Sequence, residues 1–315
     1  MEKSESNSAP GREHGNKKFG HVPVLLKPAI EFLAIKRGGT YVDATLGLGG
    51  HSWEIARRLG REGRLIGFDK DPAALERAHE RLTPPAELAG DWPAIELIHA
   101  SFGEVAQHVA AGSAGGLLAD LGVSSMQFED AARGFSFQAE GPLDMRMNPQ
   151  SGLTAEQVVN RFDERELADA IYEFGEERRS RRIARAIVRA RPIHSTAHLA
   201  EVISAAARPM NHADRRIHPA TRTFQALRIL VNRELDDLRT LLSRSSAPQV
   251  LKPGGRVVII SFHSLEDRIV KDALRDGARD GLYSVLTKKP VIADEEEIER
   301  NPRSRSAKLR AAERL

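Results

Sequence analysis

The sequence predicts an α/β fold: a doubly wound, mostly parallel, Rossmann-like sheet with a small helical domain inserted into it. Three observations support this prediction. Apolar runs that end in Asp43, Asp69 and Asp120 alternate with stretches of helical pattern. A glycine-rich turn follows the first of these runs, and a wholly helical segment separates them from a further apolar run at 256–262. Because parallel strands need crossover connections, usually helices, the alternation indicates a parallel sheet.

The glycine-rich turn predicts a nucleotide-like ligand. A strand at 41–43 leads into the turn at 47–50 and then into a helix over 52–59. Glycine permits a positive φ and lets a ligand approach the backbone N–H groups at the start of the helix. The next strand, at 64–69, ends in an acid about 20 residues after the glycines, where a ribose-binding carboxylate belongs. The alternative is a plain strand–helix connection followed by a turn-forming aspartate, and the two features together favour the ligand.

The spacing of the glycines indicates which nucleotide binds. The turn reads Gly47-x-Gly49-Gly50 after the acidic Asp43, whereas dinucleotide-binding proteins have G-x-G-x-x-G. An NAD-dependent dehydrogenase is therefore disfavoured, and the pattern is more like that of S-adenosylmethionine (AdoMet) methyltransferases. AdoMet has no pyrophosphate for a helix N-terminus to hold, so the glycines would make room for its methionine moiety.

The other elements follow from local signals and divide the chain into three parts. The sheet domain is expected to contain a helix at 28–33, a helix at 71–81, a strand at 95–99 and a strand at 116–120. Helices are predicted to begin near 154, 163, 176 and 196, followed by one long helix from Pro219 to about Leu242. The predicted parts are a disordered tail at 1–20, a sheet domain at 21–130 and 219–315, and a helical insertion at 131–218.

The composition of the chain excludes several kinds of site and reaction. The chain has 315 residues, 41% of them hydrophobic, with a formal net charge of +3 and no cysteine. The lack of cysteine excludes disulfides, Cys–zinc sites and the thiol nucleophile used to methylate a pyrimidine ring carbon. A methyl acceptor should therefore be an amine, a hydroxyl or a ring nitrogen. No ligand cluster stands out among 11 histidines, so no metal is expected. With no apolar run long enough to cross a bilayer, we expect a cytoplasmic enzyme without a membrane partner.

One predicted helix has a basic face. Between 178 and 191 there are seven arginines and no acid, and on a helical wheel most of them lie opposite an apolar face. A charged face is usually only solvated, but charge of one sign favours contact with phosphates. The arginines expected to bind RNA are Arg181, Arg182, Arg185 and Arg189. A second basic stretch, at 300–310, is a further candidate.

Eight motifs together resemble one family, the bacterial 16S ribosomal RNA cytosine-N4-methyltransferases of the MraW/RsmH type. They are HVPVLL (21–26), DATLGLGGHS (43–52), DLGVSSMQ (120–127), RGFSF (133–137), GPLDMRM (141–147), HPATRTFQALRI (218–229), ISFHSLEDRIVK (260–271) and NPRSRSAKLRAAE (301–313). The resemblance implies AdoMet-dependent methylation of the exocyclic N4 amine of a cytosine in 16S rRNA, near the decoding centre of the small ribosomal subunit. It also implies that the helical insertion helps to recognise RNA.

The resemblance also implies a set of cofactor-binding residues. They are Gly49, Gly50, His51, Asp69, Phe102, Asp120 and Gln127. The residues themselves support most of this set, since Asp69 would accept hydrogen bonds from ribose and Phe102 could cover the adenine. Gln127 rests on the resemblance alone. A non-catalytic RNA-binding or ribosome-assembly factor with a relic cofactor site remains an alternative, and the presence of both Asp69 and Asp120 argues against it.

The catalytic residue is left open. Many amino-methyltransferases have an Asn/Asp/Ser-Pro-Pro-aromatic motif after the fourth strand, but here that place reads Asp120-Leu121-Gly122-Val123. Candidates for the acceptor of the amine proton are Asp144 and His263, although Asp144 could simply cap a turn and His263 could only support a helix start. Phe135 or Phe137 could stack on an extruded base, although a core position is at least as plausible for each. Both a monomer and a homodimer are compatible with the sequence.

Overall fold

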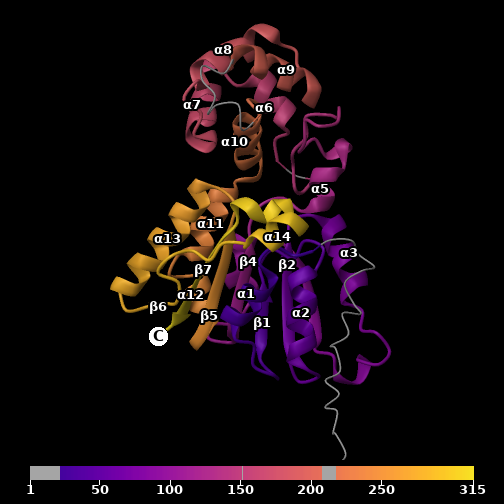
Figure 1. The fold of residues 1–315 in the computed structure, drawn as a ribbon, viewed down its shortest axis with the longest axis vertical. Helices are drawn as coiled ribbons and strands as arrows, with labels where there is room; N and C mark the ends of the chain where they lie inside the picture. Colours follow the sequence, from indigo (N-terminus) through magenta and orange to yellow (C-terminus); the bar gives the residue numbers. More distant parts are fainter. Residues whose placement is uncertain (1–21, 151, 208–217) are drawn as a thin grey trace, which may run out of the picture.

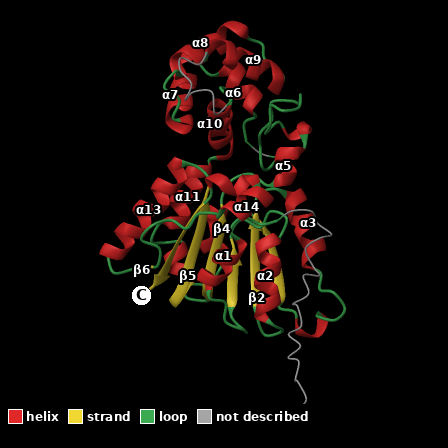
Figure 2. Ribbon diagram, in the orientation of Figure 1, coloured by secondary structure: helices red, strands yellow, loops and turns green. Residues whose placement is uncertain are grey.

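The computed structural model describes residues 22–150, 152–207 and 218–315. Its centre is a seven-stranded sheet of order β3-β2-β1-β4-β5-β7-β6 (Figure 2). The strands are β1 (Thr40–Asp43), β2 (Arg64–Asp69), β3 (Ala94–His99), β4 (Ala114–Asp120), β5 (Leu251–Ser261), β6 (Tyr283–Val285) and β7 (Lys308–Arg314). Strands β1 to β5 pair in parallel, and β7 pairs antiparallel with both β5 and β6. The predicted doubly wound, mostly parallel sheet is therefore confirmed.

Helices cover both faces of this sheet. They are α1 (Leu26–Leu33), α2 (Gly50–Leu59), α3 (Pro72–Leu82), α4 (Val105–His108), α11 (Glu234–Leu242), α12 (Ala247–Val250), α13 (Ser264–Arg279) and α14 (Glu295–Arg300). One hydrophobic cluster joins the sheet to α1, α2 and α3, and another joins its opposite face to α4, α11 and α13. Successive strand residues enter opposite clusters, as Tyr41 and Val42 do, because side chains of a strand alternate between its two faces.

A helical region stands over the carboxyl edge of the sheet (Figure 1). It contains α5 (Ser125–Glu129), α6 (Ala155–Arg161), α7 (Glu164–Gly175), α8 (Ser180–Ala190), α9 (Thr196–Ala206) and α10 (Thr221–Asn232). Thr154 and Asp163 form capping boxes at the starts of α6 and α7, where the sequence places helix starts. Ser195, rather than Thr196, caps α9, and α8 begins four residues later than expected.

The single long helix expected after Pro219 is wrong, because the chain forms two helices there. Arg233 adopts a left-handed conformation with φ 54° and ends α10. The apolar residues on either side then serve different cores: Phe224 packs in the helical region, whereas Leu238 packs against the sheet. The domain limits at 131 and 218 stay predictions, and the packing of α10 extends the helical core beyond 218. The expected polar tail lies outside the described residues.

Candidate active site

A cavity of about 370 Å³ lies at the carboxyl edge of the sheet. Its walls come from the ends of the parallel strands and from parts of α10, α11 and the segment 120–128. Six of the seven predicted cofactor residues line it: Gly50, His51, Asp69, Phe102, Asp120 and Gln127. Gly49 is not among the lining residues. Residues predicted from separate motifs thus meet around one space.

The glycine turn shapes the start of α2. Gly49 has φ 72°, and a Cβ there would lie 3.4 Å from the Cβ of Ala78, so this glycine faces α3 rather than the cavity. At Gly50 a Cβ would lie 2.5 Å from Cγ of Pro23. Glycine therefore allows Pro23 to close over the start of the helix, where it lines the cavity as well.

Asp69 connects the glycine turn to α3. One of its carboxylate oxygens accepts a hydrogen bond from the Gly47 N–H and the other accepts one from the Asp71 N–H, each at 2.8 Å. Burial raises the pKa of the Asp69 carboxyl to about 6 despite these bonds. Each oxygen keeps a further lone pair on a residue that lines the cavity.

Asp120 is a buried acceptor at the end of β4. Its Oδ2 lies 3.6 Å from Nδ1 of His51, whose Nε2 donates to the carbonyl of Val24 at 3.0 Å. Its Oδ1 is buried and has no hydrogen-bond partner among the residues that the structure describes. Burial, followed by the negative charges of Asp43 and Glu266, raises the pKa of Asp120 well above its ordinary value. A buried, unpartnered acceptor of this kind is uncommon and indicates a functional site.

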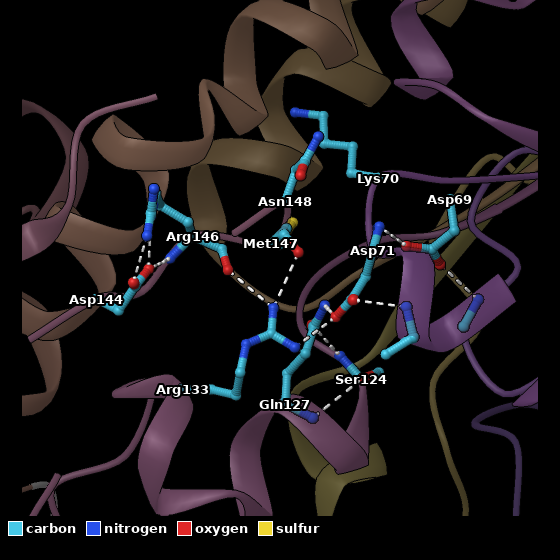
Figure 3. Close-up of polar contacts among 12 residues, drawn as sticks. Asp69, Lys70, Asp71, Ser124, Gln127, Arg133, Asp144, Arg146, Met147 and Asn148 are labelled. Carbon is cyan, nitrogen blue, oxygen red and sulfur yellow. Dashed lines mark hydrogen bonds and ion pairs between the residues drawn. The ribbon is translucent and has the colours of Figure 1, made fainter. Parts of the chain in front are cut away.

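Figure 3 shows a polar network around Asp71, which caps α3 and is fully buried. Gln127 donates to Oδ2 of Asp71 at 2.8 Å, and Arg133 donates to the same oxygen at 2.7 Å. Arg133 also donates to the carbonyls of Arg146 and Met147, each at 2.9 Å. The Gln127 carbonyl oxygen accepts from the Ser124 N–H, so most of this amide is engaged within the protein. The network fixes residues 146 and 147 to the start of α3.

Neither catalytic candidate lies among the cavity-lining residues. Although burial of Asp144 acts in the opposite direction, its hydrogen bonds from Arg146, at 2.8 and 2.7 Å, lower the pKa of this carboxyl. His263 caps α13, with Nδ1 accepting from the Glu266 N–H at 3.4 Å and Nε2 lying 3.1 Å from Glu266 Oε1. A catalytic role for either residue stays an untested prediction, and each has the structural role that the sequence left open as its alternative.

Neither predicted stacking aromatic lines this cavity. Phe135 is buried in the core of the helical region. Phe137 is partly buried and stacks on His218, with ring centroids 4.6 Å apart. Phe262, at the end of β5, does line the cavity.

The comparisons with known proteins agree with this geometry. A family model described as the MraW methylase family matches residues 18–315. The chain belongs to this family. Two of its relatives are proteins named ribosomal RNA small subunit methyltransferase H: one from Koribacter versatilis, 72% identical over 99% of both chains, and one from Acidobacterium capsulatum, 64% identical over 93% of this chain and 98% of the relative. The protein of that name from Synechococcus elongatus is 51% identical over 94% of this chain and 95% of its own.

Among the charged cavity residues that sequence reasoning missed in this member of the MraW methylase family are Arg228, Glu234 and Glu266. They lie within or next to two of the motifs, HPATRTFQALRI and ISFHSLEDRIVK, but nothing local marks them. In the periodic pattern of α10, Arg228 reads as an ordinary polar position. Arg228 meets Glu234 across the turn between α10 and α11, and Glu266 joins the same cavity from α13.

The basic face of α8 has the orientation that the helical wheel predicts. Ile183, Ala184 and Ile187 are buried, whereas the four arginines predicted to bind RNA are exposed. Arg185 pairs with Glu164 at 3.1 Å. In the second basic stretch, Lys308 and Arg310 both pair with Asp267.

Arg303 belongs to the same C-terminal stretch and lines the cavity. Its guanidinium lies 5.5 Å from the centroid of the Phe128 ring. Within the described parts of the chain, no group of three or more histidines and acids is placed to hold a metal ion. No helix of the described residues is long and apolar enough to cross a membrane.

Proposed function

We propose that this chain transfers the methyl group of AdoMet to the exocyclic N4 amine of a cytosine in 16S rRNA of the small ribosomal subunit. The observation that carries the proposal is one cavity holding both a ribose-type carboxylate, Asp69, and a buried acceptor without a partner, Asp120 Oδ1. Membership of the MraW methylase family and the names of three relatives support the substrate class.

The residues present fit AdoMet. Asp43, Asp69 and Asp120 place three carboxylates at neighbouring strand ends, and burial raises the pKa of each. A sulfonium cation nearby would offset this unfavourable negative charge. Asp69 would accept from the ribose hydroxyls, Phe102 would contact the adenine, and the open space at Gly47 would admit the methionine moiety. When bound, AdoMet supplies an electrophilic methyl group.

Asp69 generates a pH dependence for cofactor binding. Its pKa is about 6 in the free protein, and ribose hydroxyls bind the ionised carboxylate, so binding lowers this pKa. AdoMet affinity should therefore be highest above about pH 7. Below the pKa of Asp69 in the free protein, the affinity should fall by up to about tenfold per pH unit. Calorimetric titrations from about pH 5 to about pH 8 measure this dependence.

Asp69→Asn is the matched control because its side chain has a similar shape and does not titrate. Asp120 is present in both proteins, so its own titration cancels in the ratio of the two affinities. A ratio that stays constant across the pH range would rule out Asp69 as the ribose carboxylate.

Asp120 is the proposed acceptor for the amine. The lone pair of a cytosine N4 is delocalised into the ring, so an acceptor for one N4 proton concentrates electron density on the nitrogen. Oδ1 of Asp120 is free to accept that hydrogen bond. As the N4–CH3 bond forms and the S–CH3 bond breaks, N4 must lose a proton, and Asp120 takes it up. The raised pKa makes this carboxylate a stronger base than an ordinary aspartate, as a proton acceptor requires.

Asp120→Asn should lower the single-turnover rate of methyl transfer by roughly 100-fold or more, since general-base catalysis contributes that order of rate. Labelled AdoMet and RNA, followed by nucleoside analysis, should identify N4-methylcytidine as the product of the parent enzyme. Asp144→Asn is the matched control and should keep close to the parental rate. A methyl group on the ring carbon would overturn the proposed function, and a parental rate in Asp120→Asn would remove Asp120 from the mechanism.

The arginine face of α8 is the proposed contact with the RNA backbone. Replacing Arg181, Arg182, Arg185 and Arg189 together with Gln keeps the helix propensity and the buried apolar face. Losing four phosphate contacts should flatten the log–log dependence of RNA affinity on salt by roughly 3 units, at ~0.7–0.9 per contact. AdoMet affinity should not change, because none of the four lines the cavity.

Replacing Arg275 and Arg279 with Gln is the control for loss of positive charge, since both are exposed on α13 and paired with nearby acids. An unchanged salt dependence in the fourfold variant would mean that this face is only solvated. We place the reaction in the cytoplasm, where bacterial small subunits are assembled.

A further inference from the structure

Arg228 and Glu234 form a clamp across the junction between α10 and α11. Nε and Nη2 of Arg228 donate to the two carboxylate oxygens of Glu234, at 2.9 and 2.8 Å. The side chains are 18% and 7% exposed, and Arg233, with its left-handed backbone, lies between them in the chain. Two parallel hydrogen bonds of this kind fix the plane of the guanidinium as well as its position.

The clamp leaves one nitrogen of Arg228 available. Nη1 makes no hydrogen bond within the described residues, although Arg228 lines the cavity. Its two N–H groups are donors on a side chain held by its other two nitrogens. Such a rigid donor beside a cavity indicates that the ligand offers an acceptor.

The surrounding charges favour a neutral acceptor over a phosphate. Glu234 offsets the charge of Arg228, and Glu266, which is 2% exposed, is a second carboxylate on the lining of the cavity. Asp120 adds a third to the same cavity. The other basic residues of the lining, Lys70 and Arg303, are paired with Asp237 and Glu129. Because the positive charges of the lining are offset in this way, an anionic ligand atom would meet repulsion from the carboxylates, whereas a ring nitrogen would not.

Arg228 and Asp120 line the same cavity. Glu266, in the first turn of α13, lines this cavity as well. Asp120 offers an acceptor and Arg228 a donor. Cytosine presents the complementary pair, a donor at N4 beside an acceptor at N3, whereas uracil presents an acceptor at O4 beside a donor at N3.

We infer that Nη1 of Arg228 donates to N3 of the target base, so that Arg228 selects cytosine, and that Glu234 is the residue that positions it. This inference rests on the proposed function, because it places the target base in this cavity. It adds a specificity residue from the helical region to an acceptor, Asp120, from the sheet.

The test is a double-mutant cycle between protein and RNA. One change removes the proposed donor, Arg228, and the other removes the proposed acceptor, N3 of the base. RNA carrying 3-deazacytidine at the target position lacks the N3 acceptor but keeps the N4 amine. With the parent enzyme, this RNA should lose roughly 10- to 100-fold in single-turnover rate, the range for a hydrogen bond to a charged group. The affinity of the RNA measured without AdoMet should fall in the same direction.

The protein change is the double variant R228Q/E234Q, because Arg228→Gln alone would leave Glu234 buried without its partner. This variant should lose a similar factor with cytidine RNA and lose nothing further with 3-deazacytidine RNA. Glu234→Gln alone keeps the guanidinium but loosens it, so the penalty for 3-deazacytidine should shrink without vanishing. Arg239→Gln, on the exposed side of α11, is the control and should show the full parental penalty.

The outcomes distinguish a failure of the proposed function from a failure of the contact between Arg228 and N3. If the parent enzyme does not methylate N4 of cytidine, the proposed function fails. If it does, but the losses from R228Q/E234Q and from 3-deazacytidine simply multiply, the contact between Arg228 and N3 does not exist. A calorimetric loss of AdoMet affinity in R228Q/E234Q would assign Arg228 to the carboxylate of the cofactor and would also overturn the inference.

Discussion

The burial of three carboxylates at one edge of the sheet is the constraint on which the rest of this structure depends. Strand β1 lies between β2 and β4, so Asp43, Asp69 and Asp120 end neighbouring strands. Burying an ionised carboxylate is unfavourable unless donors surround it. Asp43 has the Ser52 hydroxyl at 2.6 Å, and Asp69 has two backbone N–H groups. Asp120 keeps one oxygen without a hydrogen-bond partner among the described residues. We propose that a cationic methyl donor and an amine supply the missing positive charge and hydrogen bond.

The seam between the sheet and the helical region is built from polar contacts that converge on this edge. Asn232, the last residue of α10, accepts from the Met147 N–H and donates to the Met145 carbonyl, both at 2.7 Å. Lys70, directly after β2, donates to the carbonyl of Asn232 at 2.7 Å. With the Arg133–Asp71 pair, these bonds hold the helical region against the strand ends. The proposed base site therefore depends on both regions at once.

The sequence predicted the features that local patterns determine. Strand ends, helix caps such as Asp71 and Thr154, and the buried face of α8 depend on residues close together in the chain. Contacts between distant segments could not be predicted in this way. Arg133 meets Asp71 from 62 residues away, and Arg228 meets Glu234 only because the chain turns at Arg233. The apolar pattern continues through that turn, so it predicted one helix. The chain instead forms two helices, and each packs into a different hydrophobic core.

The most direct test of the central claim is a crystal structure of the protein with S-adenosylhomocysteine and a short RNA that contains the target cytidine. The account predicts that the base enters the cavity at the carboxyl edge of the sheet, with N4 about 3 Å from Oδ1 of Asp120. A base bound elsewhere, with N4 facing Asp144 or His263 and Asp120 still without a partner, would contradict it.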